Sequence, residues 1–328
     1  MNLKLSAAGF AIQTAKGTAK TQPAFWGPLG GGALVTLPID QKEDELTSAK
    51  VAGVGEFRES VAVAVDCETR AWPKSIGGRL YAVLGDISTV GGAAPYTHTI
   101  IPAALLPWAT VFGAKDAARK AASDCKLDEL KIEWEGNGPL KVTETWAGLG
   151  FLYSADAYSP VLDETGLAYL KGIMLATTLD LNGATYDGGA KVLGGSIDIK
   201  RNIAGDVYSG TFLPGDIYEG ALEIDVELKV RVPDLLPVRA LLTGTASGTV
   251  PTPVVPYGSF SLVFTQVAAT EVLTLGATRV AWTADEPDAD PKGGPAEITL
   301  KGRCYGAATT PFTAFTAVVV NAHASYAG

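Results

Sequence analysis

Histidine and cysteine, which most often supply nucleophilic, general-base or metal-binding chemistry, are scarce and scattered in this sequence. There are two histidines, His98 in the segment YTHTIIP and His323 in the segment NAHASYAG. The three cysteines, Cys67, Cys125 and Cys304, lie far apart and have no C-x-x-C spacing, which favours free thiols over a zinc site or a disulfide framework. We therefore expect neither a histidine-assisted nucleophile nor a transition-metal site.

Two other patterns could bind ions or phosphates, and neither has the required spacing. The acidic segment DEPDADPKGG, residues 285–294, lacks the central glycine and the closing glutamate of an EF-hand loop. The glycine runs at 30–32 and 91–92 lack the lysine and the strand-to-helix context of a phosphate-binding loop. The first is interpreted as a hairpin tip and the others as turns, so we expect no catalytic residue, no cofactor and no metal, and a protein that is not an enzyme.

The overall composition is that of a packed globular protein. Of 328 residues, 47% are hydrophobic and 19% are charged, and this length allows two domains that each bury a core. The sequence has no apolar run of about 18 residues and no basic leader followed by an apolar segment, so we expect a soluble intracellular product. The formal net charge of −9 argues against tight binding of nucleic acid through its phosphates.

A long alternating segment is the clearest structural signal. In residues 222–232, LEIDVELKVRV, apolar and charged side chains alternate strictly. This alternation predicts a strand with one buried face. Residues 61–70 show the same alternation less strongly. The charged positions of the two segments, Glu223, Asp225 and Glu227 with Asp66 and Glu68, would then lie on the exposed faces of their strands.

These two segments belong to a longer repeat. The landmarks Gly55, Pro73 and Arg79 recur 160 residues later, whereas the buried faces of the two strands match at a spacing of 161. A one-residue slip would turn every side chain over, so either one copy carries a β-bulge or part of the landmark match is chance. A glycine-closed apolar run, a loop and a tyrosine-opened strand follow in both copies, which predicts that Tyr96 and Tyr257 are equivalent.

The remaining elements can be assigned by their turn residues. Residues 126–134 and 140–149 are expected to pair across the EGNGP turn, and residues 277–284 and 296–306 across the acidic loop. The best helix candidate is residues 112–127, FGAKDAARKAASDCKL, because alanine and lysine favour helices, and residues 79–85, RLYAVLG, are a second one. We divide the chain into an N-terminal arm or long loop at 1–50 and two repeated β units at 51–160 and 161–328.

Several of these segments resemble the major tail tube proteins of long-tailed, siphovirus-like bacteriophages. The resemblance is carried by YTHTIIPAALLPWATV, by the hairpin CKLDELKIEWEGNGPLKVTETWAG, and by GGSIDIKRNIAGDVYSGTF followed by EGALEIDVELKV. It implies a mainly β fold of two tandem antiparallel β-sandwich or half-barrel units with short flanking helices. It further implies rings that stack into a tube, and a chain with two units is expected to form a three-chain ring of pseudo-sixfold symmetry, with a six-chain ring as the alternative.

The resemblance also implies partners and a location. The expected partners are further copies of this chain, other tail proteins and double-stranded DNA in transit without specific binding, with no membrane; the expected location is the virion tail, and the host cytoplasm during assembly. The carboxylates at Glu223, Asp225, Glu227, Asp66 and Glu68 are candidates to line the lumen, because an acidic wall repels phosphate; the alternative is that they face outer solvent. Another virion β-sandwich, such as a head decoration or adhesin-like protein, remains the alternative function.

Overall fold

The protein was analysed as a computed structural model, which describes most of the chain. The described residues are 6–28, 39–43, 56–61, 63–115, 118–153, 169–181, 184–186, 191–206, 214–232, 236–245, 247–255, 257–266, 270–284, 297–306 and 313–326. They form a mainly β protein in which sixteen strands share one large antiparallel sheet, together with the helices α1 (Ser75–Leu84) and α2 (Leu236–Thr243). The predicted fold class is confirmed.

Seven strands form what we call the central sheet. In order across the sheet they are β5 (Val63–Arg70), β10 (Lys141–Tyr153), β9 (Ala118–Glu135), β13 (Lys191–Lys200), β16 (Glu223–Arg231), β19 (Glu297–Cys304) and β18 (Val272–Ala284). The long strands β9, β10 and β18 continue beyond the central sheet, where β9 and β10 stay paired with each other while β9 also pairs with β8, and β18 pairs with β17 and β20.

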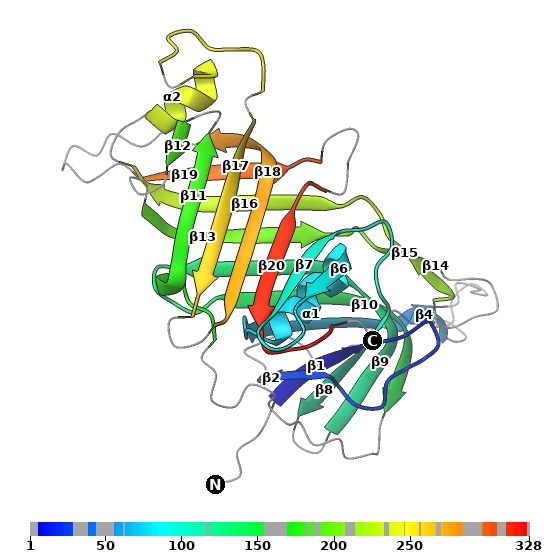
Figure 1. The fold of residues 1–328 in the computed structure, drawn as a ribbon. Coiled ribbons are helices and arrows are strands. Elements are labelled where there is room, and N and C mark those ends of the chain that lie inside the picture. Colours follow the sequence, from blue (N-terminus) through cyan, green and yellow to red (C-terminus); the bar gives the residue numbers. More distant parts are fainter. Residues whose placement is uncertain are drawn as a thin grey trace, which may run out of the picture.

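These continuations form two flanking sheets. The first flanking sheet contains β8 (Ala109–Lys115), β1 (Ser6–Ile12) and β2 (Phe25–Pro28) beside β9 and β10. The second contains β20 (Thr316–Asn321), β17 (Tyr257–Thr265), β11 (Leu175–Leu181) and β12 (Ala184–Tyr186) beside β18, and it is extended by β7 (Tyr96–Pro102) and β6 (Gly85–Val90). In Figure 1 the strands β11 (green), β17 (yellow), β18 (orange) and β20 (red) run across strands of the central sheet such as β13 and β16.

Short elements complete the fold. The hairpin of β3 (Ile39–Glu43) and β4 (Glu56–Val61) precedes β5, and the hairpin of β14 (Ala204–Asp206) and β15 (Asp216–Tyr218) precedes β16. A single 3₁₀ turn, η1 (Gly172–Met174), leads into β11. Buried side chains of all three sheets and of both helices join in one hydrophobic core.

The strand order is the same in the two halves of the chain. The first half reads β2, β1, β8, β9, β10, β5 across its sheets, and the second half reads β12, β11, β17, β18, β19, β16. Each half places a helix directly after the strand β5 or β16, and each helix is followed by a glycine with positive φ, Gly85 at 104° and Gly244 at 80°. A left-handed residue at this place is the usual way to end a helix. The order of these strands and helices is therefore the same in the two halves.

A shared β-bulge fixes the alignment of the two halves. Ala109 pairs with Cys125 and Val111 pairs with Ala122, so one residue of β8 lies opposite two residues of β9. Gly258 pairs with Val280 and Phe260 pairs with Ala277, so one residue of β17 likewise lies opposite two residues of β18. Following the ladders outward from Cys125 and Val280 leads to Val63 on β5 and to Ile224 on β16, which are 161 residues apart.

For the landmarks that follow the strand, Pro73 and Arg79, the two repeat spacings can be reconciled. Neither the β5–β10 ladder nor the β16–β19 ladder contains a register shift, so the strands that match at 161 carry no bulge, and the bulge within the first copy lies earlier, between Arg58 and Ser60 of β4. Instead, two residues separate Arg70 from Pro73, whereas one separates Arg231 from Pro233. The strands match at 161 and the following landmarks at 160 because the second connection is one residue shorter.

Two further predictions are corrected. Residues 112–127, predicted as a helix, form most of the hairpin of β8 and β9, because burial in the first flanking sheet overrides the local propensity of alanine and lysine. Tyr96 and Tyr257 open strands as expected, but they are not equivalent, since β17 occupies the place of β8 and not that of β7. The hairpin of β6 and β7 is an insertion in the first half, and it pairs with β20 of the second half.

The other local predictions can be compared directly. The second helix candidate, residues 79–85, lies largely in α1, and the two predicted closing hairpins are present as β9–β10 and β18–β19. The acidic loop, residues 285–294, lies outside the described residues, as does the predicted unit boundary near 160. Within the predicted N-terminal arm, β1 pairs with β8 along all seven of its residues.

Candidate functional site: the polar face of the central sheet

One face of the central sheet is apolar and the other is charged. The alternation predicted for residues 222–232 is confirmed, because Ile224, Val226, Leu228 and Val230 are buried. The same alternation on β5, β9, β10, β13 and β19 turns their apolar residues toward the flanking sheets. The opposite face is left to charged and small polar side chains, and we call it the polar face.

The polar face carries nearly equal numbers of acidic and basic side chains. Among the described residues its ten carboxylates are Asp66, Glu68, Glu129, Glu133, Glu135, Asp198, Glu223, Asp225, Glu227 and Glu297. Its nine cations are Arg70, Lys131, Lys141, Lys191, Lys200, Lys229, Arg231, Lys301 and Arg303. The face is therefore much closer to neutral than its most acidic strand indicates.

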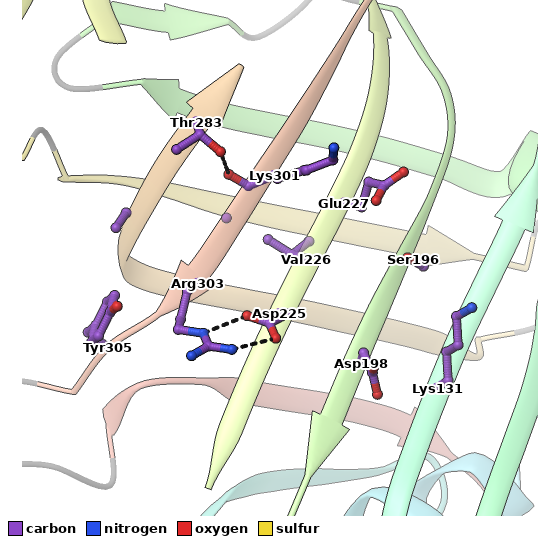
Figure 2. A pocket seen from close by; sticks show the side chains of 12 residues that line it. Lys131, Ser196, Asp198, Asp225, Val226, Glu227, Thr283, Lys301, Arg303 and Tyr305 are labelled. Atoms are coloured by element: carbon purple, nitrogen blue, oxygen red, sulfur yellow. Dashed lines mark hydrogen bonds and ion pairs between the residues drawn. The ribbon is translucent and has the colours of Figure 1, made fainter. Parts of the chain in front are cut away.

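The carboxylates named from the sequence have different surroundings. Arg303 on β19 bonds Asp225 through both carboxylate oxygens, at 2.8 and 2.9 Å, and also bonds Glu223 at 2.9 Å. Figure 2 shows the Arg303–Asp225 pair beside Glu227, which lies opposite Lys301 in the strand register. Asp66 and Glu68 lie at the other end of the sheet on β5, opposite Thr145 and Thr143 of β10. The contact of Arg303 with Asp225 could not be predicted from the sequence, because no local pattern connects Arg303 to a strand almost eighty residues earlier.

The polar face is hollowed in its middle. One hollow of about 570 Å³ lies over β9, β13, β16, β19 and β18, and Figure 2 shows side chains from these strands around it. A second hollow of about 670 Å³ lies beside it over β5, β10, β9, β13 and β16. Side chains that surround both hollows include Lys131, Ser196 and Glu227. The polar face is therefore concave.

A group of ion pairs spans the boundary between the two halves on this face. Lys200 of β13 contacts Asp198 at 3.1 Å and Glu129 of β9 at 3.6 Å. Partial burial, and then the nearby charge of Asp198, raise the pKa of Glu129. The hydrogen bond and charge of Asp198 raise the pKa of Lys200. Lys200 thus keeps two carboxylates of different strands together.

Backbone ladders join the two halves. β13 of the second half pairs with β9 of the first half from Gly194 to Lys200, which makes the central sheet continuous. β20 pairs with β7 in the second flanking sheet. The chain then returns to the first half, where the Tyr326 hydroxyl donates to the Lys74 carbonyl and its ring packs over Gly77.

Side chains at the root of the β14–β15 hairpin also cross between the halves. The Arg201 guanidinium donates to the carbonyls of Ala103 and Ala104, at 3.1 and 3.3 Å. Glu219 accepts from the Leu106 amide at 2.9 Å and from Lys126 at 2.6 Å. The second half therefore seals the segment of the first half that leads into β8.

The residues with the greatest catalytic potential serve the fold. His98 is buried between Thr89 and the main chain of His323, with its Nδ1 2.9 Å from the Thr89 hydroxyl and its Nε2 2.8 Å from the His323 carbonyl. Burial raises the pKa values of all three cysteine thiols, which makes them poor nucleophiles. Within the described residues, no group of three potential metal-binding side chains comes together.

None of the helices in the described part of the chain is long and apolar enough to cross a membrane.

Comparison with known proteins gives one result. A search of curated proteins finds no match. Comparison with protein families matches residues 5–314 to the family described as phage tail tube protein, a structural family and not an enzymatic one. This match covers nearly the whole chain and agrees with its mainly β structure. The chain belongs to the phage tail tube protein family.

Proposed function

We propose that three copies of this chain close into a ring of pseudo-sixfold symmetry, and that such rings stack into the tube of a phage tail. The observation that carries the proposal is the strand order repeated within one chain, including its bulge. Two equivalent units already share a continuous sheet through the β9–β13 ladder. Repeating that relation between chains places six units around an axis with three chains. On this proposal the two units are residues 6–153 and 169–326 of the described chain.

The concave polar face is the surface that suits the lumen. Its apolar opposite face is occupied by the core, so this face contacts water. On this proposal Glu223, Asp225 and Glu227, with Asp66 and Glu68, line a conduit for double-stranded DNA. Fixed ion pairs across the strands leave few cations available to grip phosphate, which favours passage over binding. The virion tail is the site of this function, after assembly in the host cytoplasm from copies of this chain and other tail proteins.

Images of the purified protein test the proposal. Electron microscopy is expected to show hollow tubes or rings with a central channel, and light scattering of isolated rings is expected to give the mass of three chains. A ring of six chains would contradict the three-chain ring but would still support the proposal that the protein forms a tail tube. Compact monomers or solid spikes would instead favour a head decoration or adhesin-like protein.

A further inference from the structure

The segment that leads into β8 has an exposed counterpart in the second half. The bulge alignment pairs Ala109 of β8 with Gly258 of β17, so that the sequence AALLPW, residues 103–108, matches TPVVPY, residues 252–257. Both segments begin with the same contact to the end of the preceding helix. The Ala103 amide donates to the Leu84 carbonyl at 2.6 Å, and the Thr252 amide donates to the Leu242 carbonyl at 3.1 Å.

The aromatic residue that ends each segment is also used in the same way. The Lys126 ammonium lies 4.1 Å from the centre of the Trp108 ring, and the Arg279 guanidinium lies 4.2 Å from the centre of the Tyr257 ring. Such a cation–π contact orients the aromatic ring against its own sheet. The two segments are therefore equivalent in backbone position and in their side-chain support.

The two segments differ in what covers them. In the first half the Arg201 and Glu219 contacts described above seal the segment, and Leu106 is only 5% exposed. Its counterpart Val255 is 54% exposed, and Tyr257 is 39% exposed. An apolar surface that is covered in one unit and open in the equivalent unit indicates a missing neighbour.

The position of the covering element identifies that neighbour. Arg201 and Glu219 flank the β14–β15 hairpin, which precedes β16 of the second half. The element in the corresponding place of the first half is the β3–β4 hairpin, which precedes β5. In the described residues, side chains at the root of a second-half hairpin cover a first-half segment, so the root of a first-half hairpin is the equivalent cover for the second-half segment.

We propose that the surface formed by Thr252–Val255 and Tyr257 binds the β3–β4 hairpin of a second copy of this chain. This inference rests on the proposed ring, and it assigns one of the contacts that closes it. Each chain would offer one such surface and one such hairpin, which makes the contact head-to-tail and suits a closed ring.

Two adjacent valines provide a matched pair of variants. Leu105 stays 73% exposed although its segment is covered within the chain, and its counterpart Val254 is 70% exposed. Val254 should therefore stay outside the contact, whereas Val255 should be buried in it. Because both valines are exposed in the monomer, neither Val255→Asp nor Val254→Asp should lower the melting temperature of the monomer.

Gel filtration with light scattering then tests the proposal. Val255→Asp is expected to lose the ring peak and elute as a monomer, and Val254→Asp is expected to assemble like the unmodified chain. Normal assembly of Val255→Asp would overturn the proposal, as would an equal loss of assembly by Val254→Asp.

Crosslinking identifies the occupant. A photoreactive benzoylphenylalanine in place of Tyr257, in a mixture of ¹⁴N- and ¹⁵N-labelled chains, is expected to give mixed-isotope crosslinks to peptides from residues 39–61. Tubes that form with crosslinks elsewhere, or with none, would overturn this contact and leave the proposed function intact. An unmodified chain that forms neither rings nor tubes would overturn both.

Discussion

The two halves solve the same packing problem with exchanged side chains. In the first half Trp146 on β10 lies opposite Leu127 on β9. In the second half the equivalent pair is Gly302 on β19 and Trp282 on β18. In the second half the tryptophan therefore lies on the neighbouring strand, and a glycine occupies the position that corresponds to Trp146. Each half thus keeps one buried tryptophan at this place in its core.

We expect Gly302→Val to destabilise the protein. A Cβ at this position would lie 2.6 Å from the Val280 side chain and 2.7 Å from the Trp282 ring, and overpacking of a core costs about 1–3 kcal/mol. Urea denaturation measures the loss, and the Trp282→Leu background is the control. Gly302→Val should cost less in that background, so an equal cost in both would contradict the role of the ring.

The acid of a buried ion pair in the first half has an apolar counterpart in the second half. Arg79 and Glu144 form an ion pair with both side chains almost fully buried; Arg79 also donates to Ser75, and Trp146 donates to Glu144. The equivalent of Glu144 in the second half is Leu300, which is also buried.

We therefore expect Glu144→Ala to be costly and a paired replacement to be milder. Removing one partner of a buried pair costs about 3–5 kcal/mol, whereas replacing both by apolar residues is often nearly neutral. Urea denaturation of Glu144→Ala and of the Arg79→Met, Glu144→Leu double variant measures the difference. A double variant that is less stable than Glu144→Ala would contradict this account.

At the scale of elements, the ladder between β7 and β20 contains the buried histidine. Burial lowers the pKa of His98 below its usual value, so the folded state disfavours the proton that the unfolded state accepts. The stability contributed by neutral His98 is therefore present above the unfolded pKa of about 6.5, and it is lost as the pH falls below that value.

We expect the melting temperature to fall between about pH 7 and pH 5 for this reason. His98→Gln should be less stable than the unmodified chain at neutral pH but should show a shallower fall. His323→Gln removes the other histidine of the chain and is the matched control, since the hydrogen bond to His98 comes from the His323 main-chain carbonyl, which the substitution keeps. If His323→Gln flattens the fall as much as His98→Gln does, the fall does not come from His98.

Elements whose signal is local could be predicted from the sequence, and those decided by distant contacts could not. The alternation of β16 and the glycine-rich turn between β9 and β10 each depend on consecutive residues, so both elements could be predicted from the sequence. Residues 112–127 were misread because their alanines and lysines favour a helix in isolation, while pairing with β1 and β10 decides for strands. The inserted β6–β7 hairpin hid the match between LLPW and VVPY, because it shifts the first segment relative to the landmarks before it. The charged strand face was predicted, but its neutralisation by Arg303 depends on a partner strand that no local pattern names.

At the scale of the whole molecule, the balance of charge on the polar face sets what a tube of this protein would do to DNA. Changing Glu223, Asp225 and Glu227 together to lysine adds three cations and removes both partners of Arg303. These ion pairs are exposed, and each contributes about 0–1 kcal/mol, so we expect rings and tubes to form normally.

DNA should pass more slowly through such a tube, because lysine binds phosphate. Ejection rate or infectivity at low salt measures the effect, and the triple glutamine variant is the control that removes charge without adding it. Ejection at the normal rate by the lysine tube would contradict a lumen position for these residues.

The β9–β13 ladder also has a consequence for the rate of assembly. Because one polypeptide contains both strands, the two units meet at an effective concentration set by the linker and not by the amount of protein in solution. A ring of three such chains has to gather three molecules, where a ring of single units has to gather six. At equilibrium its abundance would rise with the third power of the free chain concentration and not the sixth, so rings would persist at dilutions where single-unit rings fall apart.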